Sequence, residues 1–324
     1  MTTDAGGKFR IGLIGTGPWA ARTHAPALAA HPDVEFAGVW GRRPEAAAEL
    51  ATAFGTTAYE DEEELFESCD AVAFALPPDV QATLALRAAA MGCHLLLDKP
   101  VATTVEAARQ VADFADLGGV ASVVFCTLRF AEPTARWIDE QAAAGGWFLG
   151  EAHWLGSLFA PGSTSAYAAS PWRREKGGLW DVGPHVLSAY LPVLGDVTDM
   201  TAVRGPADTH HLVMHHTSGA TSTATLTLSA PPKAAGAALA FYGEQGRVAM
   251  PQWDGAAGAY TRAIDALIES ARTGVPHPCD VRFGTRITEI LAEAEAQMTA
   301  AAGQEEASAR VSPARPRPPC SPSP

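Results

Sequence analysis

The sequence of 324 residues has few cysteines and no long apolar run, and each shortage excludes a class of protein. The five cysteines are an odd number and are scattered without a C-x-x-C pair, which fits reduced thiols and no structural zinc site. No apolar stretch reaches the roughly 18 residues of a membrane-spanning helix. Residues 1–8 lack the apolar segment of a signal peptide, so we expect a cytoplasmic protein without a membrane partner.

Positive charge is also scarce, because 36 Asp and Glu residues oppose 23 Lys and Arg residues and leave a net charge of −13. Nucleic acids and anionic membranes attract basic surfaces, so this balance argues against both as partners. An anionic cofactor stays compatible, since a few local arginines and backbone amides decide such a site. The apolar fraction of 47% provides core for two domains or one large one.

Strand and helix patterns alternate through the first 130 residues. Residues 71–76 and 94–97 are continuously apolar, as expected of strands that are covered on both faces. This alternation predicts an α/β fold with a doubly wound parallel sheet. The predicted strands are 9–15, 35–41, 70–76, 94–98 and 121–126, and the predicted helices are 19–30, 44–54, 79–91 and 104–117.

The second half predicts longer antiparallel strands in an open sheet, with Ser218-Gly219 as a hairpin turn. We place a first domain at 1–128, a second α/β domain at 129–302 and a disordered proline-rich tail at 303–324. The predicted strands are 151–159, 200–204, 210–217, 220–229 and 235–242, and the predicted helices are 132–143, 184–194, 258–273 and 283–300.

The first strand runs directly into residues 15–20, G-T-G-P-W-A, and a helix pattern follows. Gly15 permits the tight turn, Gly17 lets the backbone approach a pyrophosphate, and Ala20 lets the helix pack closely on the strand. The start of the helix directs free N–H groups at a diphosphate. The place of this turn between a strand and a helix is stronger evidence than its glycine spacing. It predicts dinucleotide binding by Gly15, Thr16, Gly17, Trp19 and Ala20.

The end of the second strand indicates which dinucleotide is bound. A carboxylate there accepts hydrogen bonds from a ribose 2′-hydroxyl, whereas arginine pairs with a 2′-phosphate. The strand ends in Arg42 and Arg43, while Asp33 and Glu35 lie at its other end. Two planar guanidinium groups suit a phosphate, so the sequence favours NADP(H), with NAD(H) as the alternative.

Three more motifs follow in order: Leu76-Pro77-Pro78, Asp98-Lys99-Pro100 and residues 177–185, G-G-L-W-D-V-G-P-H. With the glycine-rich turn, and over about residues 8–300, they resemble the Gfo/Idh/MocA family of sugar and inositol oxidoreductases. The resemblance implies a nicotinamide-binding Rossmann domain and an open, mostly antiparallel α/β domain. It also implies a homodimer or homotetramer formed through that second sheet. The cofactor contacts it adds are Leu76, Pro77, Asp98, Lys99 and Pro100.

Hydride transfer at a carbinol carbon requires a proton to move at its oxygen. His185 suits that role because the ordinary pKa of histidine lies near working pH. Asp181, one helical turn earlier, can orient the imidazole or bind a substrate hydroxyl. Lys99, at the carboxyl end of a parallel strand, can stabilise negative charge on the reacting oxygen. We therefore predict Lys99, Asp181 and His185 as catalytic residues and no metal.

The substrate contacts are less well defined by the sequence. Trp172-Arg173 matches a pair that is frequent in the family before the glycine motif, and Arg129-Phe130 matches another, for which a structural role is equally compatible. Aromatic faces and planar cations suit sugars, although core or surface roles fit each residue as well. The predicted contacts are Arg129, Trp172, Arg173 and Trp180, with Phe159, Tyr167 and Arg174 as further wall residues.

Two positions depart from the family pattern: Gln81 stands where a histidine is frequent, and Ser188 where an aspartate is. The four histidines of residues 210–216 fit an ordinary strand better than a metal site, because neighbours face opposite ways and residues four apart lie ~13 Å from each other.

The leading function is oxidation or reduction of a hydroxyl or keto group of a sugar, cyclitol or related small molecule. The alternatives are reduction of a non-sugar carbonyl, C=N or C=C bond, and a non-catalytic nicotinamide-binding regulator, against which the intact catalytic set argues.

Overall fold

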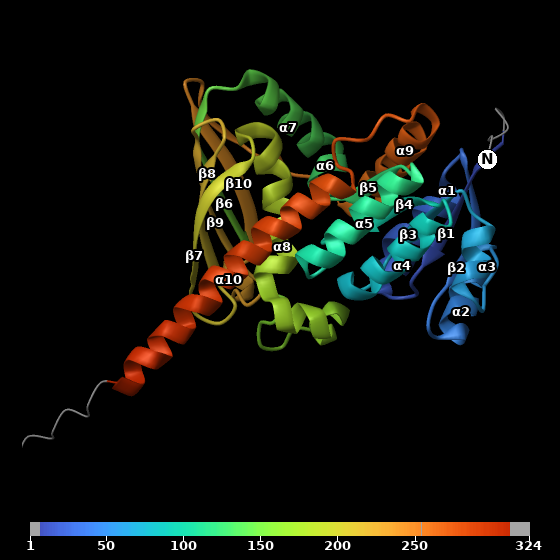
Figure 1. Cartoon of the computed structure of the whole chain (residues 1–324), viewed down its shortest axis with the longest axis horizontal. Coiled ribbons are helices and arrows are strands. Elements are labelled where there is room, and N and C mark those ends of the chain that lie inside the picture. Colours follow the sequence, from blue (N-terminus) through green and yellow to red (C-terminus); the bar gives the residue numbers. More distant parts are fainter. Residues whose placement is uncertain (1–6, 254, 312–324) are drawn as a thin grey trace, which may run out of the picture.

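The computed structural model describes residues 7–253 and 255–311, and it holds two sheets with helices between and around them (Figure 1). The first sheet has five parallel strands in the order β2-β1-β3-β4-β5, which confirms the predicted doubly wound sheet. The central strand β3 is buried along its whole length, because helices cover both faces of the sheet. The strands are β1 (Phe9–Ile14), β2 (Val34–Trp40), β3 (Ala71–Phe74), β4 (His94–Asp98) and β5 (Ser122–Phe125).

Helices α4 and α5 cover one face of this sheet, and α1 and α9 cover the other (Figure 1). Helix α9 comes from the C-terminal part of the chain, and its Tyr260 packs edge-to-face on Phe125 of β5 at 4.8 Å. The division at residue 128 therefore stays a proposal. The predicted helix 19–30 begins with a π-helical turn. The helices are η1 (Ala20–His24, π), α1 (Ala25–Ala30), α2 (Pro44–Phe54), α3 (Glu62–Glu67), α4 (Pro78–Ala90), α5 (Val105–Gly118) and α9 (Ala256–Thr273).

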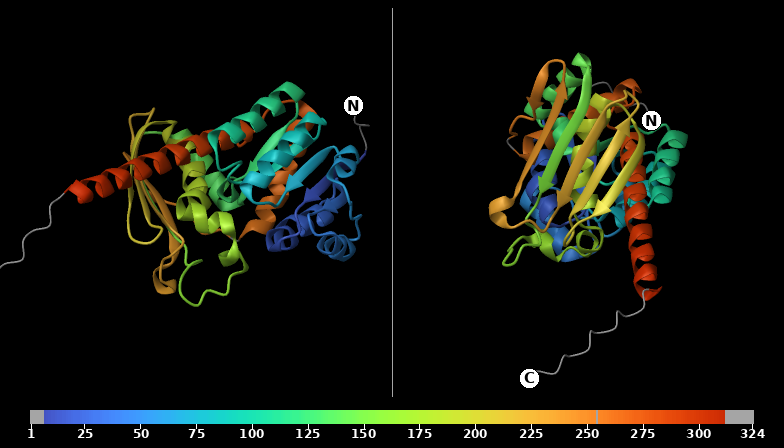
Figure 2. Two further views of the ribbon diagram at one scale, coloured as in Figure 1. Left: turned by 60° about the horizontal axis from the view of Figure 1, so that its bottom comes forward. Right: turned by 90° about the vertical axis from the view of Figure 1, so that its left-hand side faces the viewer.

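The second sheet has six strands in the order β11-β10-β6-β9-β8-β7. Only β6 and β9 pair in parallel, so the prediction of a mostly antiparallel sheet is confirmed, as is the hairpin turn at Ser218-Gly219. Helix α8 covers one face, and the described residues leave the other face open (Figure 2). The strands are β6 (Trp147–Leu155), β7 (Val197–Arg204), β8 (His210–His216), β9 (Thr221–Thr227), β10 (Gly236–Gly243) and β11 (Gly246–Ala249), of which β11 was not predicted.

Two helices of this part differ from the prediction. Helix α8 spans more than the predicted 184–194 and is kinked at Gly177, whose φ of +63° leaves the helical region. Helix α10 continues to Val311, so the tail predicted from residue 303 is wrong for 303–311, where Ala, Gln and Glu are strong helix formers. The rest of that tail lies outside the described residues. The remaining helices are α6 (Thr127–Phe130), α7 (Glu132–Ala144), α8 (Pro171–Leu194), α10 (Val281–Val311), η2 (Ala166–Ala169) and η3 (Pro232–Ala234).

A search of the described helices finds none that is long and apolar enough to span a bilayer.

Candidate active site

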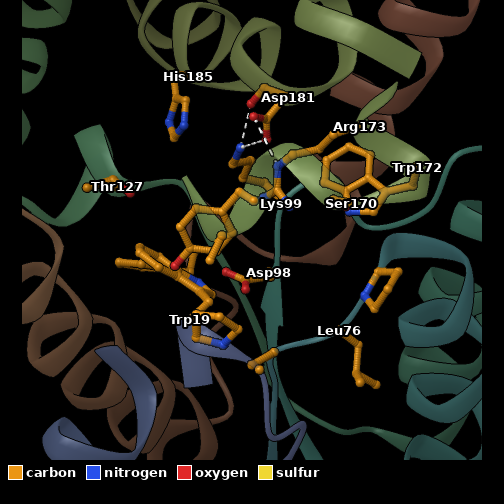
Figure 3. A pocket seen from close by; sticks show the side chains of 17 residues that line it. Trp19, Leu76, Asp98, Lys99, Thr127, Ser170, Trp172, Arg173, Asp181 and His185 are labelled. Carbon is orange, nitrogen blue, oxygen red and sulfur yellow. Dashed lines mark hydrogen bonds and ion pairs between the residues drawn. The ribbon is translucent and has the colours of Figure 1, made fainter. Parts of the chain in front are cut away.

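A cavity of about 380 Å³ lies where the carboxyl ends of the parallel strands face α8 (Figure 3). Open α/β sheets bind ligands at this end, and the volume lies within the usual range of small-molecule sites. The side facing the first sheet is made by turns after β1 and β3 and by the end of β4. The opposite side is made by α8 and the loop before it. The principal lining residues are Gly17, Trp19, Leu76, Pro77, Asp98, Lys99, Thr127, Tyr167, Trp172, Arg173, Asp181 and His185.

The glycine-rich turn has the geometry that a pyrophosphate site needs. Gly15 has a φ of +124°, and a Cβ there would lie 2.4 Å from the carbonyl oxygen of Ala75, so only glycine fits. A Cβ at Gly17 would meet nothing within 4 Å, because its backbone borders the cavity. The turn therefore fits the close backbone approach expected of a dinucleotide site.

The tip of β2 lies against this turn. A Cβ on Gly41 would come within 2.7 Å of Thr16 Cγ2, and the Gly15 N–H donates to the carbonyl of Trp40 at 2.9 Å. Arg42 and Arg43, which follow, are exposed, and in the described part of the chain neither forms an ion pair. They stand outside the main cavity, beside the turn.

Lys99 and Arg173 both bind the carboxylate of Asp181 (Figure 3). Lys99 Nζ donates to Asp181 Oδ1 at 3.1 Å and to its backbone carbonyl, and Arg173 Nε lies 3.2 Å from Oδ2. Burial alone would raise the pKa of Asp181, but the charges of Lys99 and Arg173 outweigh it and lower that pKa. Asp181 is therefore an ionised carboxylate held between two cations.

His185 lies one turn further along α8 and stacks on Trp154 of β6, with ring centroids 4.7 Å apart. Burial holds the pKa of His185 well below its ordinary value, the charge of Lys99 lowers it further, and Asp181 opposes both. The Nδ1 atom is buried, with no hydrogen-bond partner among the described residues. The site thus holds a neutral imidazole that can accept a proton.

Comparison with known proteins agrees with this geometry. Residues 9–125 match the family model GFO_IDH_MocA, described as an oxidoreductase family with an NAD-binding Rossmann fold. This match is to the Gfo/Idh/MocA family and covers the N-terminal part of the chain. It is 32% identical over 204 residues to the D-glucoside 3-dehydrogenase of Escherichia coli (strain K12), which covers 58% of this chain and 54% of that protein. The chain thus spans about half the length of the curated relatives it matches.

Two solved structures share the fold of this chain. GenD2 from gentamicin A biosynthesis, in complex with NAD, has a TM-score of 0.78 at 19% identity and covers 90% of this chain and 95% of its own. KijD10, a 3-ketoreductase from Actinomadura kijaniata in complex with TDP-benzene and NADP, has a TM-score of 0.71 at 19% identity and covers 90% and 98%. The NAD-binding description of the matching family model supports a nicotinamide cofactor, while GenD2 holds NAD and KijD10 holds NADP.

The turn that carries Lys99 is fixed by Gln81 of α4. The fully buried Gln81 amide donates to the carbonyls of Asp98 (2.8 Å), Pro100 (3.2 Å) and Val101 (3.2 Å). Its carbonyl accepts from the Asp98 N–H at 2.9 Å, and the Lys99-Pro100 bond is cis. In the sequence, Gln81 stands out only as a departure from the family pattern. Its place on the apolar face of a predicted helix could have indicated a buried structural amide.

A different residue, Asp208, fixes the part of α8 that carries Asp181 and His185. Its Oδ2 accepts from the N–H of Gly178 (3.0 Å) and Leu228 (2.9 Å), and Oδ1 accepts from Thr227 Oγ1 (2.6 Å). Asp208 therefore caps the helix where it restarts after the kink. Burial opposes ionisation, but these hydrogen bonds prevail and lower the pKa of Asp208. No pattern in the sequence indicates this contact.

A buried pair, His24 and Tyr260, lies behind Asp98 and was also missed. The Tyr260 hydroxyl and His24 Nδ1 are 2.9 Å apart, and His24 Nε2 lies 3.5 Å from Asp98 Oδ2, longer than a good hydrogen bond. Burial, with the charge of Asp98, raises the pKa of Tyr260 well above its ordinary value. The phenol thus stays protonated and can donate to Nδ1, leaving the Nε2 hydrogen for Asp98.

The structure brings only some of the predicted substrate residues to the cavity. Trp172, Arg173 and Tyr167 line it. Arg129 instead lies 3.7 Å from Asp139 of α7, and Trp180 is fully buried in the core beneath the Lys176 ammonium. Neither residue borders the cavity, because neighbouring helical residues point about 100° apart and these two face other parts of the structure, so a substrate contact for either stays a prediction. Phe159 and Arg174 pack against each other outside it.

Histidines 210–216 alternate between buried and exposed along β8, as an ordinary strand requires.

Proposed function

We propose that the protein is an NADP(H)-dependent oxidoreductase that moves a hydride between the cofactor and a carbon bearing a hydroxyl or keto group. The substrate is a sugar, a cyclitol or a related small molecule. The observation that carries this proposal is the convergence of Lys99, Asp181 and His185 on one cavity that the glycine-rich turn also borders. The named relative, a D-glucoside 3-dehydrogenase, supports the substrate class.

The side chains divide the chemistry between them. A nicotinamide cofactor, with its pyrophosphate held by the turn of Gly15 and Gly17, would supply the hydride acceptor or donor. The neutral His185 takes the proton of the substrate hydroxyl during oxidation and returns it during reduction. The Lys99 ammonium stabilises negative charge that develops on the reacting oxygen. Asp181, held by Lys99 and Arg173, keeps the ammonium in place and accepts a second substrate hydroxyl.

The preference for NADP(H) rests on Arg42 and Arg43 beside the turn. We expect titration of the purified protein to give a Kd for NADPH at least ten times lower than for NADH. An Arg42→Ala, Arg43→Ala double variant should weaken NADPH binding and leave NADH binding nearly unchanged. An Arg136→Ala, Arg247→Ala variant removes two exposed arginines elsewhere as the control. Equal affinities in the wild-type protein would overturn the preference and leave the reaction class intact.

We also propose that two copies pack through the open face of the second sheet. Val203 and Val213 are 55% and 45% exposed there, on neighbouring strands β7 and β8. Analytical ultracentrifugation should give a dimer or tetramer for the wild-type protein and a smaller species for Val213→Glu. A wild-type monomer at micromolar concentration would contradict this.

A further inference from the structure

A second hollow adjoins the active-site cavity on the side away from the first sheet. It measures about 370 Å³, almost the same as the active-site cavity, and we call it the distal hollow. Tyr167, Arg173 and Asp181 line both spaces, so a molecule held at Asp181 can extend from one into the other. Neither the dinucleotide turn nor His185 borders the distal hollow.

The walls of the distal hollow are rich in hydroxyl groups, and their charged residues, Arg173 and Asp181, pair with each other. Three serines come from the segment between β6 and η2, and Leu158 and Leu228 add apolar surface. Hydroxyl groups both donate and accept, which matches the hydroxyls of a sugar ring, while the tyrosine and leucines suit its C–H faces. The serines are Ser157, Ser163 and Ser165.

The cations near the hollow already form ion pairs with Asp181. Among the described residues, Arg173 is the single cation that lines the hollow. Arg173 pairs with Asp181 and lies 4.5 Å from the Trp172 ring and 5.2 Å from the Tyr167 ring. Lys99, the other cation of the joined cavities, also binds Asp181. Two carboxylates, Asp98 and Asp181, balance these two charges among the lining residues. A phosphate or diphosphate group would therefore enter without a free cation to bind it.

We propose that the substrate is an uncharged glycoside of at least two units, with the reacting ring beside Lys99 and His185 and its second unit in the distal hollow. This rests on the proposed oxidoreductase function. An enzyme for phosphorylated or nucleotide-linked sugars would need a free cation at this place, and the described lining residues offer none. The second unit makes its contacts with the serine hydroxyls and with the exposed edge of Tyr167.

The test compares neutral and anionic sugars in the same assay. Reduction of NADP⁺ or NAD⁺ is followed with glucose, methyl β-glucoside, cellobiose, maltose, trehalose, glucose 6-phosphate and UDP-glucose. We expect at least one disaccharide to exceed glucose in kcat/KM by tenfold or more, and both anionic sugars to fall at least a hundredfold below that disaccharide. A higher kcat/KM for glucose 6-phosphate or UDP-glucose than for every disaccharide would overturn the proposal.

A Ser157→Tyr variant fills the distal hollow, and Ser218→Tyr places the same side chain on the exposed β8–β9 turn as a control. The disaccharide-to-monosaccharide ratio of kcat/KM should drop at least tenfold in the first variant and stay the same in the second. An equal loss for both sugars would show that no second unit occupies the hollow.

If no sugar is oxidised, the proposed function fails, and binding still decides the distal site. Saturation-transfer NMR with cellobiose, maltose and trehalose, in the presence of NADPH, should then show binding that Ser157→Tyr abolishes and Ser218→Tyr retains. No binding of any disaccharide, or binding that Ser157→Tyr leaves unaltered, would overturn the distal site itself.

Discussion

The two halves of the candidate active site are positioned in different ways. Lys99 projects from a turn at the end of a buried strand, and one helix residue, Gln81, binds four backbone groups of that turn and the residue after it. Asp181 and His185 project from α8, which restarts after a kink and is capped by Asp208 from the turn between β7 and β8. One support is a buried amide on α4, a helix packed on the same sheet, and the other is a half-buried carboxylate from a distant turn. The positions of the catalytic side chains therefore depend on polar contacts made by residues outside the motifs 98–100 and 177–185.

The largest expected effect comes from removing the side chains that these supports position. Lys99→Ala and His185→Ala should each lower kcat by about 10²–10⁴-fold, the range for acid–base and electrostatic groups. Steady-state rates with the best sugar of the panel measure this, and Lys233→Ala serves as a lysine control. A loss of less than threefold in either variant would remove that residue from the mechanism.

The second-largest effect should come from removing the side-chain amide of Gln81. Gln81→Leu leaves buried backbone groups of the Lys99 turn unpaired, each costing about 1–3 kcal/mol of the free energy of unfolding. Because the same turn borders the cofactor side of the cavity, the Kd for the nicotinamide should also rise. Denaturant unfolding and cofactor titration measure the two effects, with the exposed Gln110→Leu as control. Unchanged stability would show that the turn holds without Gln81.

Removing the carboxylate support should have a smaller and different effect. Asp208→Ala deletes a helix cap, which costs about 0.5–2 kcal/mol, and should lower kcat while cofactor affinity is kept. Asp208→Asn retains an acceptor and should recover much of kcat, whereas a residue with a structural role only would change stability and leave kcat alone. Asp199→Ala, on the exposed surface of β7, is the matched control. A loss of cofactor binding in Asp208→Ala would erase the contrast between the two supports.

The smallest change should be seen in the pH dependence. Because the pKa of His185 is lowered, the neutral base persists below pH 6.5, and kcat/KM for oxidation should stay level from pH 8 to below 6.5 before it falls. The fold favours the neutral imidazole, so its contribution to stability is complete above pH 6.5 and is lost as the pH drops through the lowered pKa. Asp181→Asn should move the acid limb lower still. An acid limb above pH 6.5 would contradict the environment described for His185.

The sequence predicted those features that rest on local pattern. Continuous apolar runs marked the buried strands, and motif order placed Gly17, Lys99, Asp181 and His185 together. The burial of Trp180 in the core could not be read from the sequence, because the direction of each side chain on α8 depends on a kink at Gly177. Asp208 and Tyr260 were missed because each acts through tertiary contacts that the sequence pattern does not reveal, whereas Gln81 could have been recognised as an amide on the apolar face of a helix. The helix through residues 303–311 was missed because the following prolines dominated the composition.

The oxidation of a sugar with the help of Lys99 and His185 is tested by mixing the purified protein with NADP⁺ and the neutral disaccharides. The absorbance of NADPH at 340 nm is then followed. Wild-type protein, Lys99→Ala and His185→Ala are compared side by side. The account predicts sugar-dependent reduction by the wild-type protein and at least a hundredfold slower reduction by both variants. Reduction that both variants sustain at the wild-type rate, or none by the wild-type protein with NADP⁺ or NAD⁺, would contradict it.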